Sequence, residues 1–145
     1  MRIRIRAHHL PTRIAAGAFI LNSGIEKLSA DEATAAYIHE SAKHTYPFLG
    51  KLKAQDFARL LAVTEIALGT ALLVPILPAG IAGAGLTAFS GGLLGMYATT
   101  PGMRKEHSIF PTQQGIPLYK DSWMLGMGLS LIVDDLTDRF CAADR

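Results

Sequence analysis

Long apolar segments alternate with polar connections along the chain, and they set the first expectation for the fold. Four such segments cover residues 10–28, 56–77, 79–97 and 122–136. A helix that crosses a bilayer needs about 20 mainly apolar residues, within a range of about 17–25. The second and third segments meet this length, and the others meet it if charged side chains at their ends reach the lipid headgroups. The pattern predicts an all-α integral membrane four-helix bundle, with these segments as its spans, in a single membrane domain over residues 1–145.

The third segment gives the strongest indication of a membrane, because no charged residue lies between Pro78 and Arg104. The alternative is a soluble bundle with buried core helices, and the helix-length rule argues against it. Pro75 and Pro78 mark a tight turn between the second and third segments. This turn predicts that the two helices form an antiparallel pair.

The connection over residues 29–55 is long enough to hold a further helix. Ser29 and Glu32 have the spacing of a capping box, in which two side chains satisfy free amides at a helix start. Small and apolar residues then recur at helical spacing as far as Tyr46, which is typical of a helix at a membrane surface. We therefore expect an additional amphipathic surface helix in this first external loop. The connection over residues 99–121, which is rich in proline and glycine, is expected to be irregular.

Basic residues suggest an orientation for the predicted bundle. Four arginines lie at or before the start of the first segment, namely Arg2, Arg4, Arg6 and Arg13. Because Lys and Arg favour the cytoplasmic side, we expect a cytoplasmic N-terminus, and four spans return the C-terminus to that side. The two long loops also carry basic residues, but long loops constrain topology less than short tails do.

Composition agrees with a membrane location and excludes several classes of protein. Only 18% of the residues are charged, against about 25% in soluble domains, and 50% are hydrophobic. The net charge is +2 and the basic residues are scattered, so nucleic acid is not an expected partner. The expected partner is a lipid bilayer. The single cysteine, Cys141, excludes an intrachain disulfide and a cysteine-based zinc site.

Glu65 is the only charged residue in the run over residues 62–78. It lies nine residues beyond the start of its segment, or about 13–14 Å into a hydrocarbon core about 30 Å thick. A charge near the bilayer centre costs about 2.5–3.5 kcal/mol, so it must be paired, hydrated or protonated. We predict that Glu65 faces the interior toward Asn22 and Ser23, with Lys27 as its cation.

The remaining charges of the first and fourth helices are expected to form one layer at each end of the bundle. Arg13 and Lys27 are 14 residues apart, about 21 Å along a helix, and Asp121 and Asp134 are 13 apart, about 20 Å. If the two helices run antiparallel, the charges match in height. One layer then contains Arg13, Asp134 and Asp135, and the other contains Glu26, Lys27 and Asp121.

These positions define a predicted intramembrane polar site, made up of Asn22, Glu26, Lys27, Glu65 and Asp121. An ionisable residue within a membrane warrants a functional hypothesis, here a proton-handling or quinone-headgroup site. The structural alternative is a polar clasp that fixes the register of the helices. Both interpretations stay open at the level of the sequence.

Other candidate chemistry is sparse. The five histidines, His8, His9, His39, His44 and His107, fall in predicted tails or loops, whereas a haem-binding bundle needs histidines inside its core. Haem is therefore not expected. His8 and His9 beside Arg6 could contact a metal, but we favour a solvated interfacial pair and predict no metal site. No nucleophile-elbow, phosphate-loop or HExxH motif identifies a catalytic residue, so enzymatic activity of the chain alone is not expected.

Small residues at four-residue spacing predict close contacts between helices, because helices within a lipid bilayer associate through close approach of their backbones. The pairs are Gly91 with Gly95 and Gly126 with Ser130. Packing inside the bundle is the favoured interpretation, and an oligomer interface is the alternative.

Three stretches resemble one family. Residues 13–28 contain an Arg-x3-Gly…Gly-x2-Lys pattern from Arg13 to Lys27, Glu65 begins a Glu-x3-Gly pattern, and a Lys-Asp pair ending in Asp121 opens the last segment. In order and spacing these motifs resemble the DoxX-like family of small four-helix bacterial membrane proteins. The resemblance implies a multi-pass protein of the bacterial cell (inner) membrane that is associated with quinone-linked redox chemistry. The chain departs from the family in its longer first loop and in the adjacent pair of aspartates at residues 134–135.

The first functional hypothesis is an accessory membrane subunit that anchors or assists a quinone-linked redox complex. Quinone would contact the protein near Glu65, Asn22 and Lys27, and no covalently bound cofactor is expected. The alternative is a non-catalytic membrane scaffold or assembly subunit of a larger complex, with a membrane or peripheral protein as partner. A transporter is disfavoured, because the third segment offers only Thr87 and Ser90 as polar residues at its centre.

Overall fold

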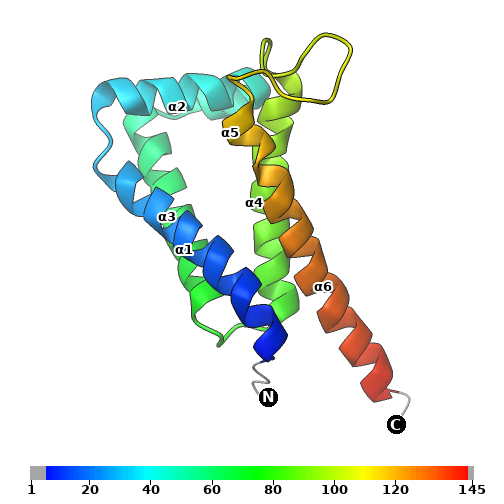
Figure 1. Cartoon of the computed structure of the whole chain (residues 1–145). Coiled ribbons are helices and arrows are strands. Elements are labelled where there is room, and N and C mark those ends of the chain that lie inside the picture. The colour runs from blue at the N-terminus through cyan, green and yellow to red at the C-terminus, as the bar shows by residue number, and fades with distance from the viewer. Residues whose placement is uncertain (1–5, 144–145) are drawn as a thin grey trace.

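The computed structural model describes residues 6–143, and in this range the predicted all-α fold is confirmed (Figure 1). The α-helices are α1 (Leu10–Leu28), α2 (Glu32–Thr45), α3 (Ala54–Leu73), α4 (Ala79–Thr99), α5 (Ile116–Tyr119) and α6 (Asp121–Ala143). Two short 3-10 helices, η1 (Ala7–His9) and η2 (Pro47–Lys51), precede α1 and α3. The described residues form no strand, only an isolated bridge between Arg104 and Pro111. Arg2 and Arg4, on which the expected orientation partly depends, lie outside the described residues.

The four long helices occur where the apolar segments predicted them, with differences at their ends. α1 has the predicted bounds. α3 ends at Leu73 rather than Leu77, because Pro75 has no amide hydrogen and cannot continue the helical hydrogen bonds. α6 continues to Ala143 rather than ending at Leu136, because the polar residues 137–139 interrupt the apolar run without interrupting the helix.

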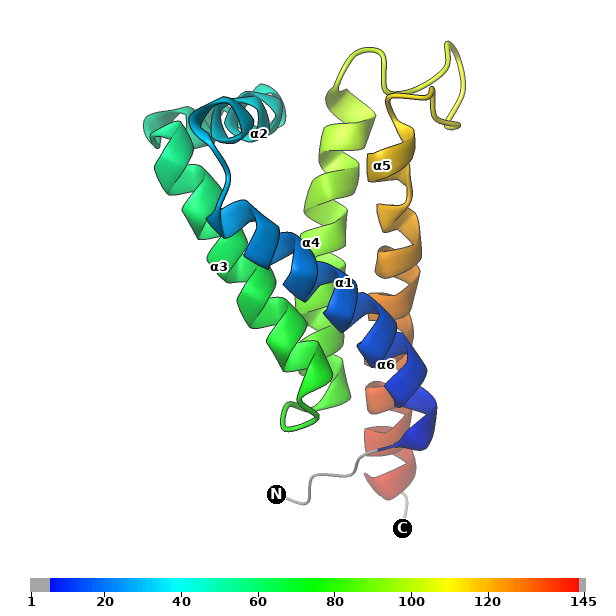
Figure 2. The same cartoon turned by 60° about the vertical axis from the view of Figure 1, so that its left-hand side comes forward.

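The long helices are arranged as two pairs (Figures 1 and 2). α1 packs along α3, and α4 packs along α6. The pairs lie close together near the start of α1 and diverge toward the other end, where α2 lies across them and contacts both α3 and α4. α3 and α4 run in opposite directions across a short turn, as predicted. Each nevertheless packs mainly against another helix, so the expected α3–α4 pair is not the main packing unit.

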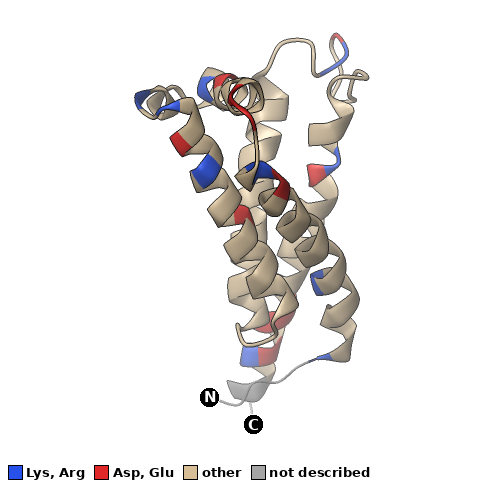
Figure 3. Ribbon diagram, turned by 90° about the vertical axis from the view of Figure 1, so that its left-hand side faces the viewer, with Lys and Arg blue, Asp and Glu red and all other residues tan. Residues whose placement is uncertain are grey.

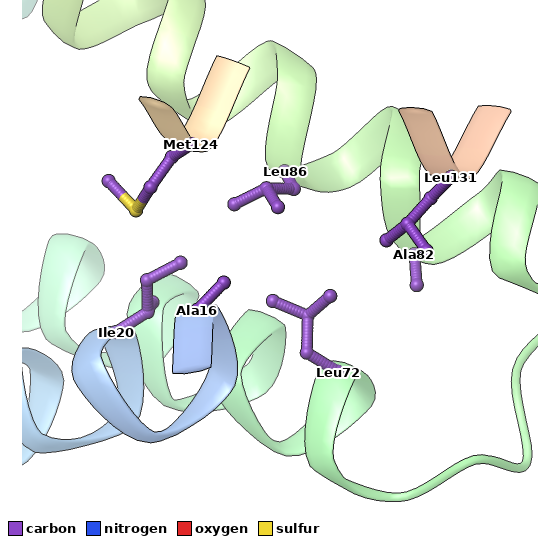
Figure 4. Close-up of a cluster of buried hydrophobic side chains, with 7 residues drawn as sticks. All are labelled: Ala16, Ile20, Leu72, Ala82, Leu86, Met124 and Leu131. Atoms are coloured by element: carbon purple, nitrogen blue, oxygen red, sulfur yellow. The ribbon is translucent and has the colours of Figure 1, made fainter. Parts of the chain in front are cut away.

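A hydrophobic core fills the space between the two pairs (Figure 4). It combines buried side chains of all four long helices, namely Ala16, Ile20, Leu72, Ala82, Leu86, Met124 and Leu131. Because α1 and α3 contribute one side of this cluster and α4 and α6 the other, the core holds the two pairs together.

Glycines set the short distance between the helices within each pair. A Cβ atom at Gly69 of α3 would lie 2.6 Å from the backbone nitrogen of Leu21 in α1. A Cβ atom at Gly83 of α4 would likewise lie 2.6 Å from the carbonyl oxygen of Gly128 in α6. Such separations are far inside van der Waals contact, so the helices approach this closely only because these residues have no side chain.

The small-residue pairs singled out in the sequence lie mostly elsewhere. Gly91, Gly126 and Ser130 are exposed, and a Cβ atom at either glycine would meet nothing within 4 Å. Gly95 alone lies against a side chain, the hydroxyl end of Tyr46. The expectation of packing inside the bundle is therefore wrong for Gly91, Gly126 and Ser130, because they lie on helix faces that point away from the rest of the chain.

The helix predicted in the first long connection is α2, and its start differs from the expected capping box. Asp31 is the N-cap residue, and its carboxylate accepts a hydrogen bond of 2.8 Å from the Thr34 amide. This bond stabilises the charged form and lowers the pKa of Asp31. The hydroxyl of Ser29 instead donates to the Glu26 carbonyl at the end of α1 (3.1 Å). At the other end of α2, the Tyr46 hydroxyl donates to the backbone of α4.

The connection between α4 and α6 is irregular, as expected, apart from the single turn α5. Gly102 adopts a φ of +81°, which a residue with a side chain rarely adopts. The Tyr97 hydroxyl donates to the Ile109 carbonyl at 2.6 Å and ties this segment to α4. The loop is thus held by specific contacts.

Membrane-spanning character differs among the long helices. Among the described helices, α4 alone is both long and apolar enough to cross a membrane. Each of the other three carries at least three charged residues, as α1 does with Arg13, Glu26 and Lys27. The apolar pattern predicted four membrane spans, but only one of the described helices qualifies, and a single such helix is weak evidence for a membrane protein.

Candidate functional site

Glu65 lies on the buried face of α3 and forms an ion pair with α1. Its side chain is 5% exposed, and its Oε2 atom is 3.0 Å from the Nζ atom of Lys27. The Lys27 ammonium also donates to the Ser23 hydroxyl at 2.6 Å. Glu65 thus faces the interior with Lys27 as its cation, as predicted, and Ser23 is linked to it through Lys27, whereas Asn22, the other predicted neighbour, is not.

The local sequence explains why these two side chains meet. Glu65 continues the buried stripe of α3, which repeats at helical spacing through Ala62, Glu65 and Gly69. Gly24 of α1 lies opposite, where a Cβ atom would come within 2.9 Å of the Glu65 Cβ atom. Lys27 is three residues beyond Gly24 and therefore on nearly the same face of α1. The missing side chain at residue 24 leaves space for the ion pair.

Asp121 adds a second carboxyl group to this region. It is the first residue of α6 and is 7% exposed. It lies close enough to Glu65 and Lys27 for both charges to act on its carboxylate. Lys27 is paired with Glu65 alone, and Asp121 is a second buried acid within electrostatic range that forms no hydrogen bond or ion pair with either of them. With all three groups ionised, the cluster carries one net negative charge. Such a cluster can retain a proton or bind a polar group that donates hydrogen bonds.

A pocket of about 460 Å³ adjoins the ion pair. Residues of the α1 end, the following turn and α2 form its walls: Ser23, Glu26, Lys27, Ser29, Ala30, Asp31, Thr34 and Ile38. Because Lys27 contacts both the pocket and buried Glu65, it connects the buried acid to the outside of the protein. We call Lys27, Glu65 and Asp121 the charged cluster.

Two predicted members of the polar site lie apart from the charged cluster. Asn22 and Glu26 are exposed, and the Asn22 amide donates to the Glu26 carboxylate at 2.8 Å. Asn22 has the expected height but points away from α3, because it is two residues from buried Gly24, or about 200° around the helix. Glu26 lines the outer pocket without contacting Glu65.

The predicted charge layer of Arg13, Asp134 and Asp135 is not formed, because its members contact different partners. Arg13 is buried, and its guanidinium donates to backbone carbonyls at the end of α3, including Leu72 at 2.8 Å and Ala71 at 2.9 Å. A helix leaves its last carbonyls without partners, and Arg13 satisfies them. Asp135 pairs with Arg139 at 2.9 Å. The expected pairing of Arg13 with the aspartates is therefore not formed.

Asp134 accepts its hydrogen bonds from the N-terminal segment. Its Oδ2 atom lies 3.3 Å from Arg6, 3.1 Å from His8 and 2.6 Å from His9, and Arg6 also pairs with Asp138. The sequence gives no local signal for this cluster, because more than 120 residues separate the histidines from Asp134.

Comparison with known proteins does not extend this description. No family model matches the chain, and neither curated proteins nor solved structures provide a match.

Proposed function

We propose that the protein is a multi-pass membrane protein in which α1, α3, α4 and α6 cross the bilayer as a four-helix bundle, with α2 at the surface. The support is the outer face of these helices. Large apolar side chains are exposed along all four, including Ile14, Phe19, Ile25, Leu60, Val63, Ile81, Leu129, Val133 and Leu136. Only 22% of the apolar window of α4 is buried inside the protein, unlike the core helix of a soluble domain. Lipid is the medium that solvates such surfaces.

The charges within the proposed spans fit this arrangement. Charged residues gather toward the two ends of the helices, with few between them (Figure 3). Glu65 lies between these ends and Arg13 lies in the first turn of α1; both are buried, and each is turned inward toward a partner. Ionisable groups in membranes are retained when they face the interior and are paired in this way.

We propose further that the protein is a DoxX-like accessory subunit that binds quinone at the charged cluster and assists a quinone-linked redox complex. The observation that carries this proposal is the ion pair between buried Glu65 and partly buried Lys27 at the edge of an open pocket. The Lys27 ammonium can donate to a quinone carbonyl, and the acids can exchange protons with the reduced form. The isoprenoid tail would lie in lipid along the apolar helix faces.

The positions of the family-like motifs support the same proposal. Gly24 and Gly69 lie at the α1–α3 contact, and Lys27 and Glu65 form the ion pair between these helices. Four of the residues that carry the resemblance to DoxX-like proteins therefore lie together, whereas Arg13 lies near the other end of α1. The bacterial cell membrane and a cytoplasmic location of both termini are part of this proposal.

Quinone binding is testable through Trp123, the only tryptophan, which is two residues beyond Asp121. In detergent micelles, decylubiquinone is expected to quench its fluorescence saturably in the wild-type protein. Glu65→Gln keeps the shape and removes the charge, and we expect it to raise the apparent Kd about 10-fold, equivalent to about 1.4 kcal/mol. Asp56→Asn, the same change at an exposed position of α3, should leave the Kd unchanged.

Linear, unsaturable quenching of the wild-type protein would reflect partition into micelles and would exclude a quinone site. Equal affinity of the wild type and Glu65→Gln would leave the ion pair as a clasp between helices. The non-catalytic scaffold, in which Lys27 serves only its contacts with Ser23 and Glu65, would then be the better account.

A further inference from the structure

We propose that His8, His9 and Asp134 form a binding site for a divalent transition-metal ion. The site lies at the end of the helices opposite α2 and is independent of the proposed quinone site. This proposal differs from the sequence-based prediction that the two histidines form a solvated pair and bind no metal. The structure adds the third group, a carboxylate of α6.

The geometry of the three groups is already close to that of a metal site. One potential ligand atom of each residue lies within 4.8 Å of the others. The Nε2 atoms of His8 and His9 point to the same oxygen of Asp134, at 3.1 and 2.6 Å. Two ligands that each bind zinc at about 2.0–2.1 Å with tetrahedral geometry lie about 3.3 Å apart. The His8 side chain, 60% exposed, has room for the small rotation that remains.

The hydrogen bonds of Asp134 favour the same conclusion. Its Oδ2 atom is the acceptor for three groups, Arg6, His8 and His9, although a carboxylate oxygen offers about two lone-pair directions. A bound metal removes this excess, because both imidazoles then direct lone pairs, not protons, toward the ion. Arg6 keeps its second partner, Asp138.

Charge and access are also suitable for a cation. With neutral histidines, Arg6 contributes one positive charge and Asp134 and Asp138 contribute two negative charges, so the cluster has a net charge of −1. His9 is 10% exposed and fixed, whereas the sides formed by His8 and Asp134 are open to solution. Two imidazoles and one carboxylate suit zinc and neighbouring first-row metals, and they leave at least one coordination position open.

A metal at this position would add a direct link between the N-terminal segment and α6. η1 leads directly into α1, while Asp134 belongs to α6, and α1 and α6 make few contacts along their lengths. The ion would therefore link the α1–α3 pair to the α4–α6 pair, and we expect metal binding to raise the unfolding temperature.

The test uses the full-length protein purified without a histidine tag. Zinc titrated by calorimetry should bind with one equivalent, and cobalt should give the visible absorption of a low-symmetry site with nitrogen and oxygen ligands. His9→Ala and Asp134→Asn should each weaken zinc binding by more than about 10-fold, since even groups that only hydrogen-bond to a metal ligand contribute about 10- to 100-fold. Zinc should raise the unfolding temperature of the wild type and not of these variants.

His44→Ala removes an exposed histidine of α2 and is the matched control, with wild-type affinity expected. His8→Gln alters the most exposed of the three residues and keeps the test decisive if another variant fails to fold. Absence of saturable zinc binding in the wild type would overturn the proposal. The proposal would also be overturned if the single variant His8→Gln and one of the single variants His9→Ala and Asp134→Asn both bound zinc as tightly as the wild type. The ion would then bind elsewhere.

Discussion

Lys27→Met is expected to destabilise the protein by about 3–5 kcal/mol, the range found when one partner of a buried ion pair is removed. The Glu65 side chain is 5% exposed, so without the ammonium its charge stays buried and unpaired. The free energy of unfolding can be measured by titration of mixed micelles with SDS, followed by circular dichroism. The additional change Glu65→Leu should recover most of the loss, because it removes the unpaired charge.

Lys43→Met is the matched control for this prediction. Lys43 pairs with Glu40 on the exposed side of α2, where water screens both charges, so little measurable change is expected. A loss for Lys27→Met no greater than that for Lys43→Met would show that the Glu65 pair is not the principal polar contact between α1 and α3. A double variant as unstable as Lys27→Met alone would contradict the same explanation.

Gly69→Ala is expected to destabilise the protein by about 1–3 kcal/mol through overpacking. The new Cβ atom would lie 2.6 Å from the nitrogen and 2.8 Å from the Cα atom of Leu21. Backbone atoms cannot turn aside as a flexible side chain can, so α1 must move away from α3. This movement separates Lys27 from Glu65, and the same SDS titration should report the loss.

Gly91→Ala provides the control for the glycine prediction. Gly91 is also within a helix, but it is exposed and a Cβ atom there meets nothing within 4 Å. Because alanine favours a helix over glycine by up to about 1 kcal/mol, this change should be neutral or stabilising. Equal losses at the two positions would show that helix propensity or lipid contact, and not the close approach of α1 and α3, controls the outcome.

The helical segments and the Glu65–Lys27 pair could be predicted because each depends on a local pattern. Apolar runs located the helices, and a carboxylate in such a run required a cation within reach. The prediction for Asn22 is wrong, because the height of a residue along α1 does not determine its direction around the helix. Two residues from Gly24, Asn22 points outward, and a helical wheel would have shown this.

The other end of the protein depends on contacts that no local pattern contains. Arg13 and Asp134 match in height along their helices, but the free carbonyls in the last turn of α3 are the closer partners of Arg13. The 3-10 turn before α1 brought His8 and His9 to Asp134 across most of the chain. Similarly, Ser29 and Asp31 are both good N-cap residues, and the hydrogen bond of Ser29 to the end of α1 left Asp31 to begin α2.

In the proposed membrane bundle, the outer faces of the long helices contact lipid. Spin labels at Phe19→Cys, Val63→Cys and Leu129→Cys, introduced singly after replacement of Cys141, would sample exposed apolar positions of α1, α3 and α6. In reconstituted vesicles, these labels should relax more strongly with oxygen than with a water-soluble nickel chelate, whereas a label at Lys105→Cys in the α4–α6 connection should show the reverse. Preferential relaxation by the nickel chelate at all three helix positions would place these faces in water and contradict the membrane bundle.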